Sequence, residues 1–245
     1  MSYNWNWGIL WELSPEGNGT YLDTLLVGLV WTIVAAAGAW IIALVVGSIL
    51  GIARSLPGRW FYPLATTYVE VFRNIPLLVQ LFLWYFVVPE LLPSSWGLWL
   101  KQLPNAPLYT AIVGIGLYMG SRGAEQIRAG IQARPRGQMM AATAIGLTLP
   151  QAYRYVILPL AYRIILPPLT SEFLNTIKNT SVALTIGLLE LTARARAMQE
   201  FSFQVFEAFT AATVLYLLLN IVVTLAMRFI ESRVAVPGLG IQASK

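Results

Sequence analysis

Two long runs of apolar residues without a single charge constrain the fold of this chain more than any other feature. They extend from Leu25 to Ala53 and from Ala208 to Met227. A helix needs about 20 apolar residues to cross the hydrocarbon core of a bilayer, and both runs reach that length. The sequence therefore predicts an all-α, polytopic membrane protein.

Three further segments are long enough to cross a membrane but carry charges. They are about Pro63–Pro89 with Glu70 and Arg73, about Leu108–Arg128 with Arg122 and Glu125, and about Ile164–Leu189 with Glu172 and Lys178. Together with the two uncharged runs they predict five transmembrane helices, at about 25–53, 63–89, 108–128, 164–189 and 208–227. We expect them to form one transmembrane domain that takes up residues 1–245.

Composition supports the membrane class and excludes several functions. Hydrophobic residues make up 57% and charged residues 11% of the chain, whereas a soluble domain is about 25% charged. The absence of cysteine and histidine removes disulfides, thiol nucleophiles and the commonest metal ligands, so we expect neither a catalytic residue nor a metal site. The net charge of +5 is not gathered into a basic run, which argues against nucleic-acid binding and for a membrane orientation signal.

The opening segment MSYNWNWGILWELSPEG does not resemble a signal peptide, since it lacks a basic first region and a clean apolar core. Its tryptophans are typical of a chain that lies at a membrane surface. We therefore expect a short amphipathic tail in contact with lipid.

The distribution of Lys and Arg predicts the orientation of the chain. Ten of the 16 basic residues fall on one side of the predicted spans: Arg54, Arg59, Arg128, Arg134, Arg136, Arg154, Arg163, Arg228, Arg233 and Lys245. The opposite side has only Lys101, Arg194 and Arg196. Because the basic side of a membrane protein faces the cytosol, we expect a periplasmic N-terminus, a cytosolic C-terminus and a cytosolic segment at about 134–159. The Pro89–Pro107 connection, with Trp96 and Trp99, should lie at the outer interface.

The cytosolic segment has the signals of two short helices. Alanines favour a helix over Gln138–Ile145, and Gly146 stands where a helix end requires a positive φ. Thr148 and Gln151 have capping-box spacing, which starts a second helix, and we expect that helix to stop before Pro159. The result is a helical hairpin that either couples the chain to a partner or merely connects two spans.

The residues of this hairpin resemble a known motif. Met140, Ala141, Ala142, Gly146, Val156, Leu158 and Pro159 have the spacing of the EAA motif in permease subunits of bacterial ABC importers. In that family the segment is a coupling helix that docks on the ATPase subunit, so the resemblance implies this role here. Met140 replaces the motif's Glu and Val156 replaces its Ile.

The resemblance extends along the chain. YVEVFRNIPLLVQLFLWYF, IRAGIQARPRGQ and PPLTSEFLNTIKNTSVALTIGLLEL are similar to segments of the polar amino-acid uptake family, and NWNWG and SRGAEQIR are most like glutamate/aspartate importer permeases. This implies a type I ABC importer permease in a bacterial inner membrane. Its implied partners are an ABC ATPase dimer, a second permease, usually a paralogue, and a periplasmic amino-acid-binding protein.

The chain carries no nucleotide-binding loop. No Gly-x-x-x-x-Gly-Lys-[Ser/Thr] sequence occurs in it, so nothing here can cradle ATP phosphates. We expect no cofactor in this chain, and ATP and Mg to be bound and hydrolysed by the partner ATPase.

Charges inside the predicted spans need partners or a function, because each costs about 2.5 to 3.5 kcal/mol at the bilayer centre. Glu70 and Arg73 are three residues apart on one helical face, which is close enough to pair, and Pro76 can kink the helix that follows. Since the family shares this pattern whatever the substrate, we favour a structural ion pair and gate over substrate contact.

A polar stripe marks the fourth predicted span. Its members are Glu172, Asn175, Lys178, Asn179, Thr180 and Ser181. In a membrane such a stripe should line the pathway or a subunit contact. Lys178 is common to the family, so we favour architecture and gating over specificity.

Arg122 is the candidate for substrate selection. Relatives of other specificity usually carry an aromatic residue at this place, whereas acidic amino-acid permeases carry Arg. A guanidinium can hold a carboxylate through two parallel hydrogen bonds. The alternative is an ion pair of Arg122 with Glu125 or Glu70.

Two other functional classes compete with the importer permease: a small ion-coupled secondary transporter of polar solutes, which would use the buried charges as a relay, and a membrane scaffold. Neither needs a capped hairpin with EAA spacing, so the motif favours the permease. The ranking of glutamate, aspartate, asparagine and glutamine as substrates stays open, as does the identity of the second permease.

Overall fold

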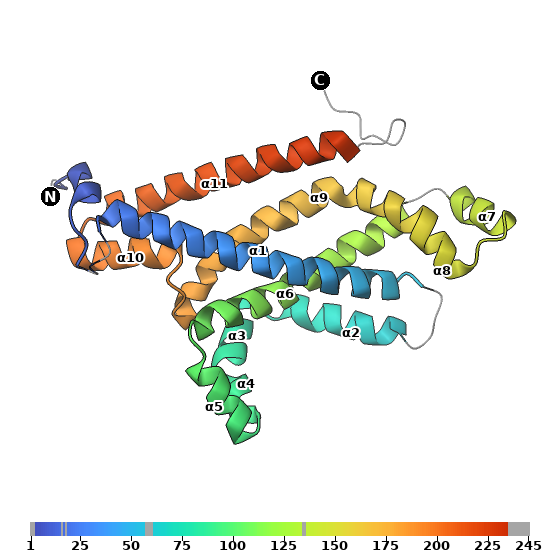
Figure 1. Cartoon of the computed structure of the whole chain (residues 1–245), viewed down its shortest axis with the longest axis horizontal. Helices are drawn as coiled ribbons and strands as arrows, with labels where there is room; N and C mark the ends of the chain where they lie inside the picture. Colours follow the sequence, from blue (N-terminus) through green and yellow to red (C-terminus); the bar gives the residue numbers. More distant parts are fainter. Residues whose placement is uncertain (1–2, 16, 18, 57–60, 134–135, 235–245) are drawn as a thin grey trace. The chain divides into compact units, whose positions relative to one another are not determined.

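The computed structural model describes residues 3–15, 17, 19–56, 61–133 and 136–234, and these are helical apart from their connections and one isolated bridge between Leu13 and Thr20. Arg59, Arg134 and Lys245 lie outside the described residues. The long helices (Figure 1) are α1 (Tyr21–Ala53), α2 (Phe61–Asn74), α6 (Ala106–Gln132), α9 (Leu158–Asn179) and α11 (Val205–Val234). The short ones are α3 (Leu77–Phe82), α4 (Val88–Leu91), α5 (Ser94–Gln102), α7 (Arg136–Ala144), α8 (Leu149–Ala152) and α10 (Leu191–Ser202). Two 3-10 helices, η1 (Trp7–Trp11) and η4 (Thr180–Ile186), and two π-helical turns, η2 (Leu83–Val87) and η3 (Tyr153–Ile157), complete the order.

Several of these helices can cross a membrane, which confirms the all-α membrane class. In the described part of the chain, α1, the continuous helical run Leu149–Ile186 and α11 are each long and apolar enough. α2 and the helical run Leu77–Leu91 pass the same criterion only as a pair bent by 103°. α6 has 27 residues, which exceeds the length that a crossing requires, but it carries Arg122, Glu125 and Arg128.

The bend in the second predicted span lies at Ile75 and Pro76, as the proline predicts. α2 ends at Asn74, α3 begins after Pro76, and the ring of a proline cannot continue a helix without a break. The side-chain amide of Gln80 donates to the carbonyl oxygen of Ile75 at 2.8 Å. This bond satisfies a backbone group that the break leaves open, so the span is broken and not one straight helix over 63–89.

Two π-helical turns each end two residues before a proline. Leu83–Val87 precedes Val88 and Pro89, and Tyr153–Ile157 precedes Leu158 and Pro159. The expectation that the helix after Thr148 stops before Pro159 is therefore wrong, because the helix runs on into α9. A proline lacks the N–H of a normal helix turn and its ring meets the carbonyl four residues earlier. The wider i→i+5 turn makes room for that ring.

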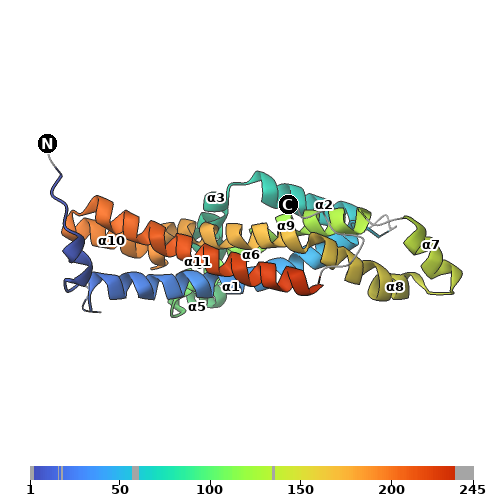
Figure 2. The same cartoon turned by 90° about the horizontal axis from the view of Figure 1, so that it is seen from above.

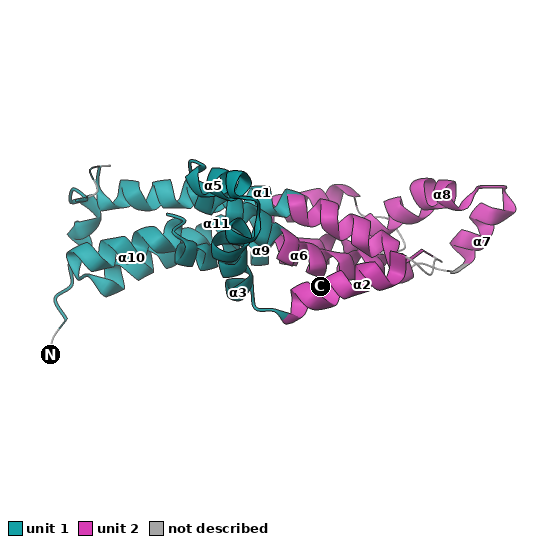
Figure 3. Ribbon diagram, turned by 90° about the horizontal axis from the view of Figure 1, so that it is seen from below, with its two compact units in different colours: residues 1–41, 75–116, 174–223 teal, residues 42–74, 117–173, 224–245 magenta. Residues whose placement is uncertain are grey.

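The described residues form two compact units, which Figure 3 colours separately. Unit 1 comprises residues 1–41, 75–116 and 174–223, and its apolar core joins η1, α1, α10 and α11. The core residues are Ile9, Tyr21, Leu25, Leu191, Ala195, Met198, Ala208 and Ala212. The N-terminal segment is thus part of this core, while Trp5, Trp7 and Trp11 are exposed.

Unit 2 comprises residues 42–74, 117–173 and 224–245 and is held together by close helix contact. Within it α1 meets α6, and the ribbons of both helices can be followed in Figures 1 and 2. The contact is a glycine face of α1. A Cβ atom added at Gly51 would lie 2.8 Å from the carbonyl oxygen of Ala124, and one at Gly47 would lie 3.1 Å from that of Gly120. Small residues four apart let two membrane helices approach this closely.

Candidate functional site

Arg122 of α6 forms a two-pronged ion pair with Glu172 of α9 in unit 2. Its Nε lies 2.7 Å from one carboxylate oxygen and its NH2 group 3.1 Å from the other. The Arg122 side chain is 41% exposed, while that of Glu172 is only 8% exposed. Both predicted partners, Glu125 and Glu70, are therefore wrong. Arg122 holds a carboxylate in the fork geometry that guanidinium groups favour, and one side of it stays accessible.

Glu125 lies at the centre of a second group of charges in unit 2. Its carboxylate contacts Arg54 at 2.5 Å, and Arg73 and Arg128 at 3.4 Å each. Three arginines against one carboxylate leave an excess of positive charge. The Arg54 side chain is buried, so its pairing with Glu125 is needed to keep that charge inside the protein.

The structure gives Glu70 and Arg73 different partners from those that their spacing predicts. Arg73 contacts Glu125, while Glu70 accepts hydrogen bonds from the side chain of Asn74 through both its backbone and carboxylate oxygens. The expected Glu70–Arg73 ion pair is thus wrong, because α6 offers Arg73 a carboxylate that sequence spacing does not reveal.

The remaining predicted pathway residues belong to unit 1 and are described separately. Lys178, Asn179 and Ser181 lie where α9 passes into the 3-10 helix η4. Lys178 is exposed, and in the part of the chain that the structure describes no carboxylate lies within ion-pair distance of it. The Ser181 hydroxyl donates to the carbonyl oxygen of Lys178 at 2.7 Å. Lys178 is therefore the free charge of the predicted polar stripe.

The predicted coupling segment is α7, a turn at Gly146 and α8, which lie at one end of unit 2 (Figure 3). Gly146 has a φ of 83°, as expected, and the capping box of Thr148 with Gln151 is present. Tyr153 donates to the carbonyl oxygen of Ser55 at 3.0 Å and so ties the segment to the end of α1.

Several large apolar side chains of this segment are exposed. Met140 is 71% and Ile145 is 77% exposed, and Leu149 and Tyr155 are exposed as well. Of the motif residues, Ala142 is buried, Val156 and Leu158 are half-buried, and Ala141 and Pro159 are exposed. A helical turn that presents large apolar groups to the outside is typical of a protein contact.

Unit 1 contains a buried polar network that no sequence pattern predicted. Glu190 is fully buried and accepts hydrogen bonds from the backbone N–H of Ala193 at 2.8 Å and the hydroxyl of Tyr216 at 2.7 Å. The hydroxyl of Thr32 lies 3.5 Å from it and accepts from the N–H of Leu191. Burial raises the pKa of the Glu190 carboxyl above its ordinary value. The one available signal was its place directly before α10, where an acidic residue caps a helix.

A second missed residue is Glu207, in the first turn of α11. It is fully buried and accepts from the hydroxyl of Tyr3 and, at 2.8 Å, from the N–H of Asn6. These bonds fix the N-terminal segment to α11 within unit 1. Separation of about two hundred residues along the chain hides this pairing from any local pattern.

Long apolar helices that carry ion pairs, together with a short helical hairpin that exposes apolar side chains, are typical of the membrane subunit of a transport protein. The chain belongs to the family described as the binding-protein-dependent transport system inner membrane component, whose model matches residues 43–236. This membership favours the permease hypothesis over the secondary transporter.

Two relatives illustrate the range of the family. The chain is 49% identical to the glutamate/aspartate import permease protein GltJ of Escherichia coli strain K12 over 241 residues, which cover 97% of this chain and 98% of that one. It is 30% identical to the glutamine transport system permease protein GlnP of the same strain, with 94% and 98% covered. The resemblance to amino-acid importer permeases is thus confirmed.

Solved structures support the same fold. The crystal structure of an amino acid ABC transporter with histidines matches with a TM-score of 0.75 and 29% identity, covering 87% of this chain and 95% of that one. An inward-facing conformation of the MetNI methionine ABC transporter matches with a TM-score of 0.71 at 20% identity, covering 86% and 97%. The second likeness concerns the fold alone.

Proposed function

We propose that this chain is a permease subunit of an ATP-driven importer of acidic amino acids, glutamate and aspartate. The observation that carries the proposal is the fork-shaped contact of Arg122 with the Glu172 carboxylate, since Glu172 has the same acidic side chain as a glutamate substrate. Similarity to the glutamate/aspartate import permease supports the substrate class.

The proposed mechanism is an exchange of carboxylates on Arg122. In the resting chain Glu172 neutralises the guanidinium, which lowers the cost of keeping it within the membrane. An arriving acidic amino acid displaces Glu172 and takes the exposed side of Arg122. At an effective dielectric near 20, opposite unit charges about 4 Å apart gain roughly 4 kcal/mol before desolvation is subtracted, and either carboxylate gains it. The displaced Glu172 is only 8% exposed, so it has to take up a proton or another partner for the exchange to proceed.

Replacement of Arg122 by Tyr tests this function. We expect Arg122→Tyr to lower glutamate and aspartate uptake on the order of 10- to 100-fold, because a hydrogen bond to a charged group contributes about 1.5–3 kcal/mol. Residual uptake of glutamine or asparagine should fall far less. Uptake of the four labelled amino acids into cells, at equal protein level, measures the difference.

Arg163→Tyr is the matched control, because Arg163 is an exposed arginine of α9 in the same unit. It should transport as the unchanged protein does. An equal loss for charged and neutral substrates in Arg122→Tyr would assign Arg122 to architecture and leave selection to the binding protein.

The proposal includes coupling to a partner that supplies energy. The exposed apolar side chains of α7 and α8 dock on an ABC ATPase dimer, which binds ATP and Mg and hydrolyses ATP, while this chain holds no cofactor and catalyses no reaction. Motif residues Met140, Ala141, Ala142, Gly146, Val156, Leu158 and Pro159 form the coupling element, a cytosolic hairpin over about 134–159.

The remaining parts of the proposal concern architecture. Residues 1–245 form one domain with five spans, in which α6 is the third and the bent pair of α2 and Leu77–Leu91 the second. The N-terminus is periplasmic and the C-terminus cytosolic in a bacterial inner membrane. A second permease, a paralogue, completes the pathway lined by Arg122, Arg73, Glu70, Lys178, Asn179 and Ser181, and a periplasmic binding protein delivers the amino acid.

A further inference from the structure

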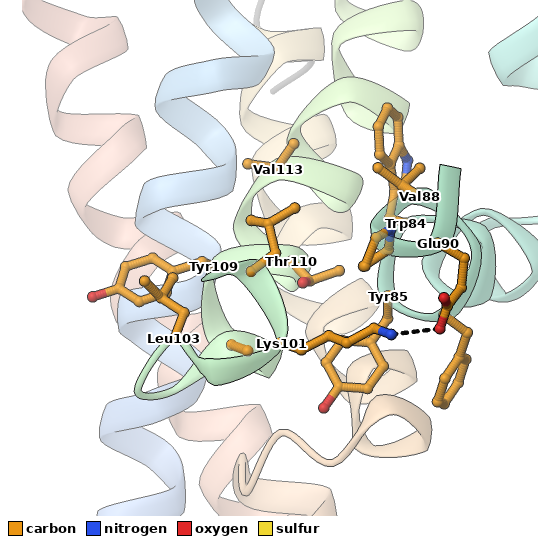
Figure 4. A pocket seen from close by; sticks show the side chains of 13 residues that line it. Trp84, Tyr85, Val88, Glu90, Lys101, Leu103, Tyr109, Thr110 and Val113 are labelled. Carbon is orange, nitrogen blue, oxygen red and sulfur yellow. Dashed lines mark hydrogen bonds and ion pairs between the residues drawn. The ribbon is translucent and has the colours of Figure 1, made fainter. Parts of the chain in front are cut away.

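A cavity of about 440 Å³ in unit 1 is built by residues that the transport mechanism does not use. Its walls come from the π-helical turn Leu83–Val87, from α4 and α5, and from the first turns of α6 (Figure 4). The volume falls within the range of about 300 to 1,000 Å³ that small-molecule sites occupy. π-helical turns are rare and are frequent at functional sites, and this one turns three aromatic residues, Trp84, Tyr85 and Phe86, to the cavity.

The wall of the cavity is mainly apolar and aromatic. Its lining consists of Trp84, Tyr85, Phe86, Val88, Pro89, Glu90, Leu100, Lys101, Leu103, Ala106, Tyr109, Thr110 and Val113. The wall between α4 and α5 is rigid, because a Cβ at Gly97 of α5 would lie 2.2 Å from the carbonyl oxygen of Pro89. No such atom fits there, so the two short helices touch through their backbones.

Two opposite charges stand together at this cavity. The ammonium group of Lys101 lies 2.5 Å from the carboxylate of Glu90, as the dashed line in Figure 4 marks. The side chains are 45% and 67% exposed. Exposed ion pairs contribute little to stability, so a ligand with both charges can exchange with this pair at small cost.

The cavity lies beside the start of α6, the proposed third span. Tyr109, Thr110 and Val113 belong to the start of α6, and α5 carries Trp96 and Trp99, both exposed. Exposed tryptophans gather at the boundary between the hydrocarbon core and the headgroups of a bilayer. A ligand in this cavity therefore has access to both apolar chains and polar headgroups.

We propose that this cavity binds a zwitterionic phospholipid with a primary ammonium headgroup, namely phosphatidylethanolamine. The phosphate pairs with Lys101, the ammonium group donates to Glu90, and the upper part of an acyl chain lies against Trp84, Val88 and Val113. An anionic headgroup without an ammonium leaves Glu90 unpaired beside a second negative charge. A choline headgroup has no N–H to donate, so it forms no hydrogen bond with the carboxylate.

Quenching of Trp84 by brominated lipids tests the proposal. The chain is purified with its partner subunits, freed of lipid in detergent, and titrated with phosphatidylethanolamine, phosphatidylcholine or phosphatidylglycerol brominated on the acyl chain. We expect a saturable component of quenching by phosphatidylethanolamine that Trp84→Phe removes, while exposed tryptophans such as Trp96 and Trp99 are quenched without saturation. Lys101→Gln should weaken the apparent affinity for phosphatidylethanolamine about tenfold, because one charge-assisted contact is lost.

Arg196→Gln is the matched control, since Arg196 forms an exposed ion pair with Glu200 on α10 of the same unit, at 2.8 Å, and does not line the cavity. It should bind the lipid as the unchanged protein does. If Lys101→Gln does not fold, the double variant Lys101→Arg, Glu90→Gln takes its place. It keeps the positive charge and removes the negative one, so it should lose the preference for phosphatidylethanolamine over phosphatidylcholine. Equal quenching by all three lipids, or displacement of the brominated lipid by free glutamate, would overturn the proposal.

Discussion

At the scale of single residues, the charges inside the spans show what spacing can predict. Sequence spacing offers partners on the same helix, three or four residues away, and so pairs Arg73 with Glu70 and Arg122 with Glu125; the one partner expected from another span was Glu70 for Arg122. The structure instead pairs Arg122 with Glu172 of α9 and Arg73 with Glu125 of α6. The need for partners was thus predictable from the energy of a charge in a membrane, whereas their identity depends on how the helices pack.

Glu172→Gln isolates the proposed exchange of carboxylates. The amide keeps the shape of Glu172 but removes the charge that competes with the substrate for Arg122, so we expect tighter binding of glutamate by the purified transporter without its binding protein. Glutamine binding should not change. Titration calorimetry of the transporter in detergent measures both, and weaker glutamate binding in this variant would contradict the exchange.

Glu190 predicts a dependence of stability on pH. Burial raises the pKa of the Glu190 carboxyl, so this carboxyl binds a proton more readily in the folded protein than in the unfolded chain. The stabilisation from the protonated form is complete below the unfolded value of about 4.5 and is lost as pH rises through the folded pKa. Glu190→Gln keeps an acceptor for Tyr216. We expect its unfolding temperature to fall less between pH 4 and pH 8 than that of the unchanged protein.

Thermal unfolding of the purified transporter at a series of pH values measures this difference. Other titrating groups are common to both proteins and cancel in the comparison. Identical pH profiles for the variant and the unchanged protein would show that Glu190 does not change its proton affinity on folding.

At the scale of elements, local rules predicted the turn at Gly146 and failed at Pro159. The positive φ of Gly146 and the capping box at Thr148 follow from neighbouring residues alone, so the sequence was sufficient for them. The prolines of this chain differ in what they do to a helix. Pro76 follows a break, Pro159 follows a wider turn, and α9 carries two more prolines inside it without either. A local rule for proline does not distinguish these cases.

Gly146→Asp tests the coupling element. The change places a side chain at a φ of 83°, where an L-residue loses on the order of 1 kcal/mol, and adds a charge to the proposed docking surface. We expect normal insertion into the membrane with loss of transport and of copurified ATPase. Western blotting, uptake and pull-down of the ATPase measure the three properties.

Gly137→Asp is the control for this experiment. Gly137 lies in α7 with open space around its Cβ position and without a positive φ, so the same charge enters the same segment without backbone strain. It should bind the ATPase better than Gly146→Asp does. Unchanged transport in Gly146→Asp would refute the coupling role.

At the scale of the whole molecule, the all-α membrane class followed from composition, whereas the division into units did not. Four of the five long helices, α1, α6, α9 and α11, contribute residues to both units. No linker, composition shift or charge run marks that division in the sequence. It arises from contacts such as the glycine face between α1 and α6, which local patterns do not specify.

Cysteine labelling tests the proposed orientation. The native chain has no cysteine, so a single one introduced at the exposed Gln102 should react with an impermeant maleimide on intact cells. One at the exposed Ala133 should react only after permeabilisation. The reverse pattern would refute the cytosolic position of α7 and α8.

The π-helical turn at Tyr153–Ile157 takes up one residue more than an α-helix needs, just before α9 begins. Because an i→i+5 turn holds this residue within about one turn of helix, the direction of α8 stays close to that of an uninterrupted helix. A residue added to the ordinary helix of α9 would, at 3.6 residues per turn, rotate α7 and α8 by about 100° around the helix axis and move them about 1.5 Å along it. Met140 and Ile145 would then face a different side. The wider turn therefore acts as a tolerance in the helix, which holds an extra residue without turning the proposed docking surface away.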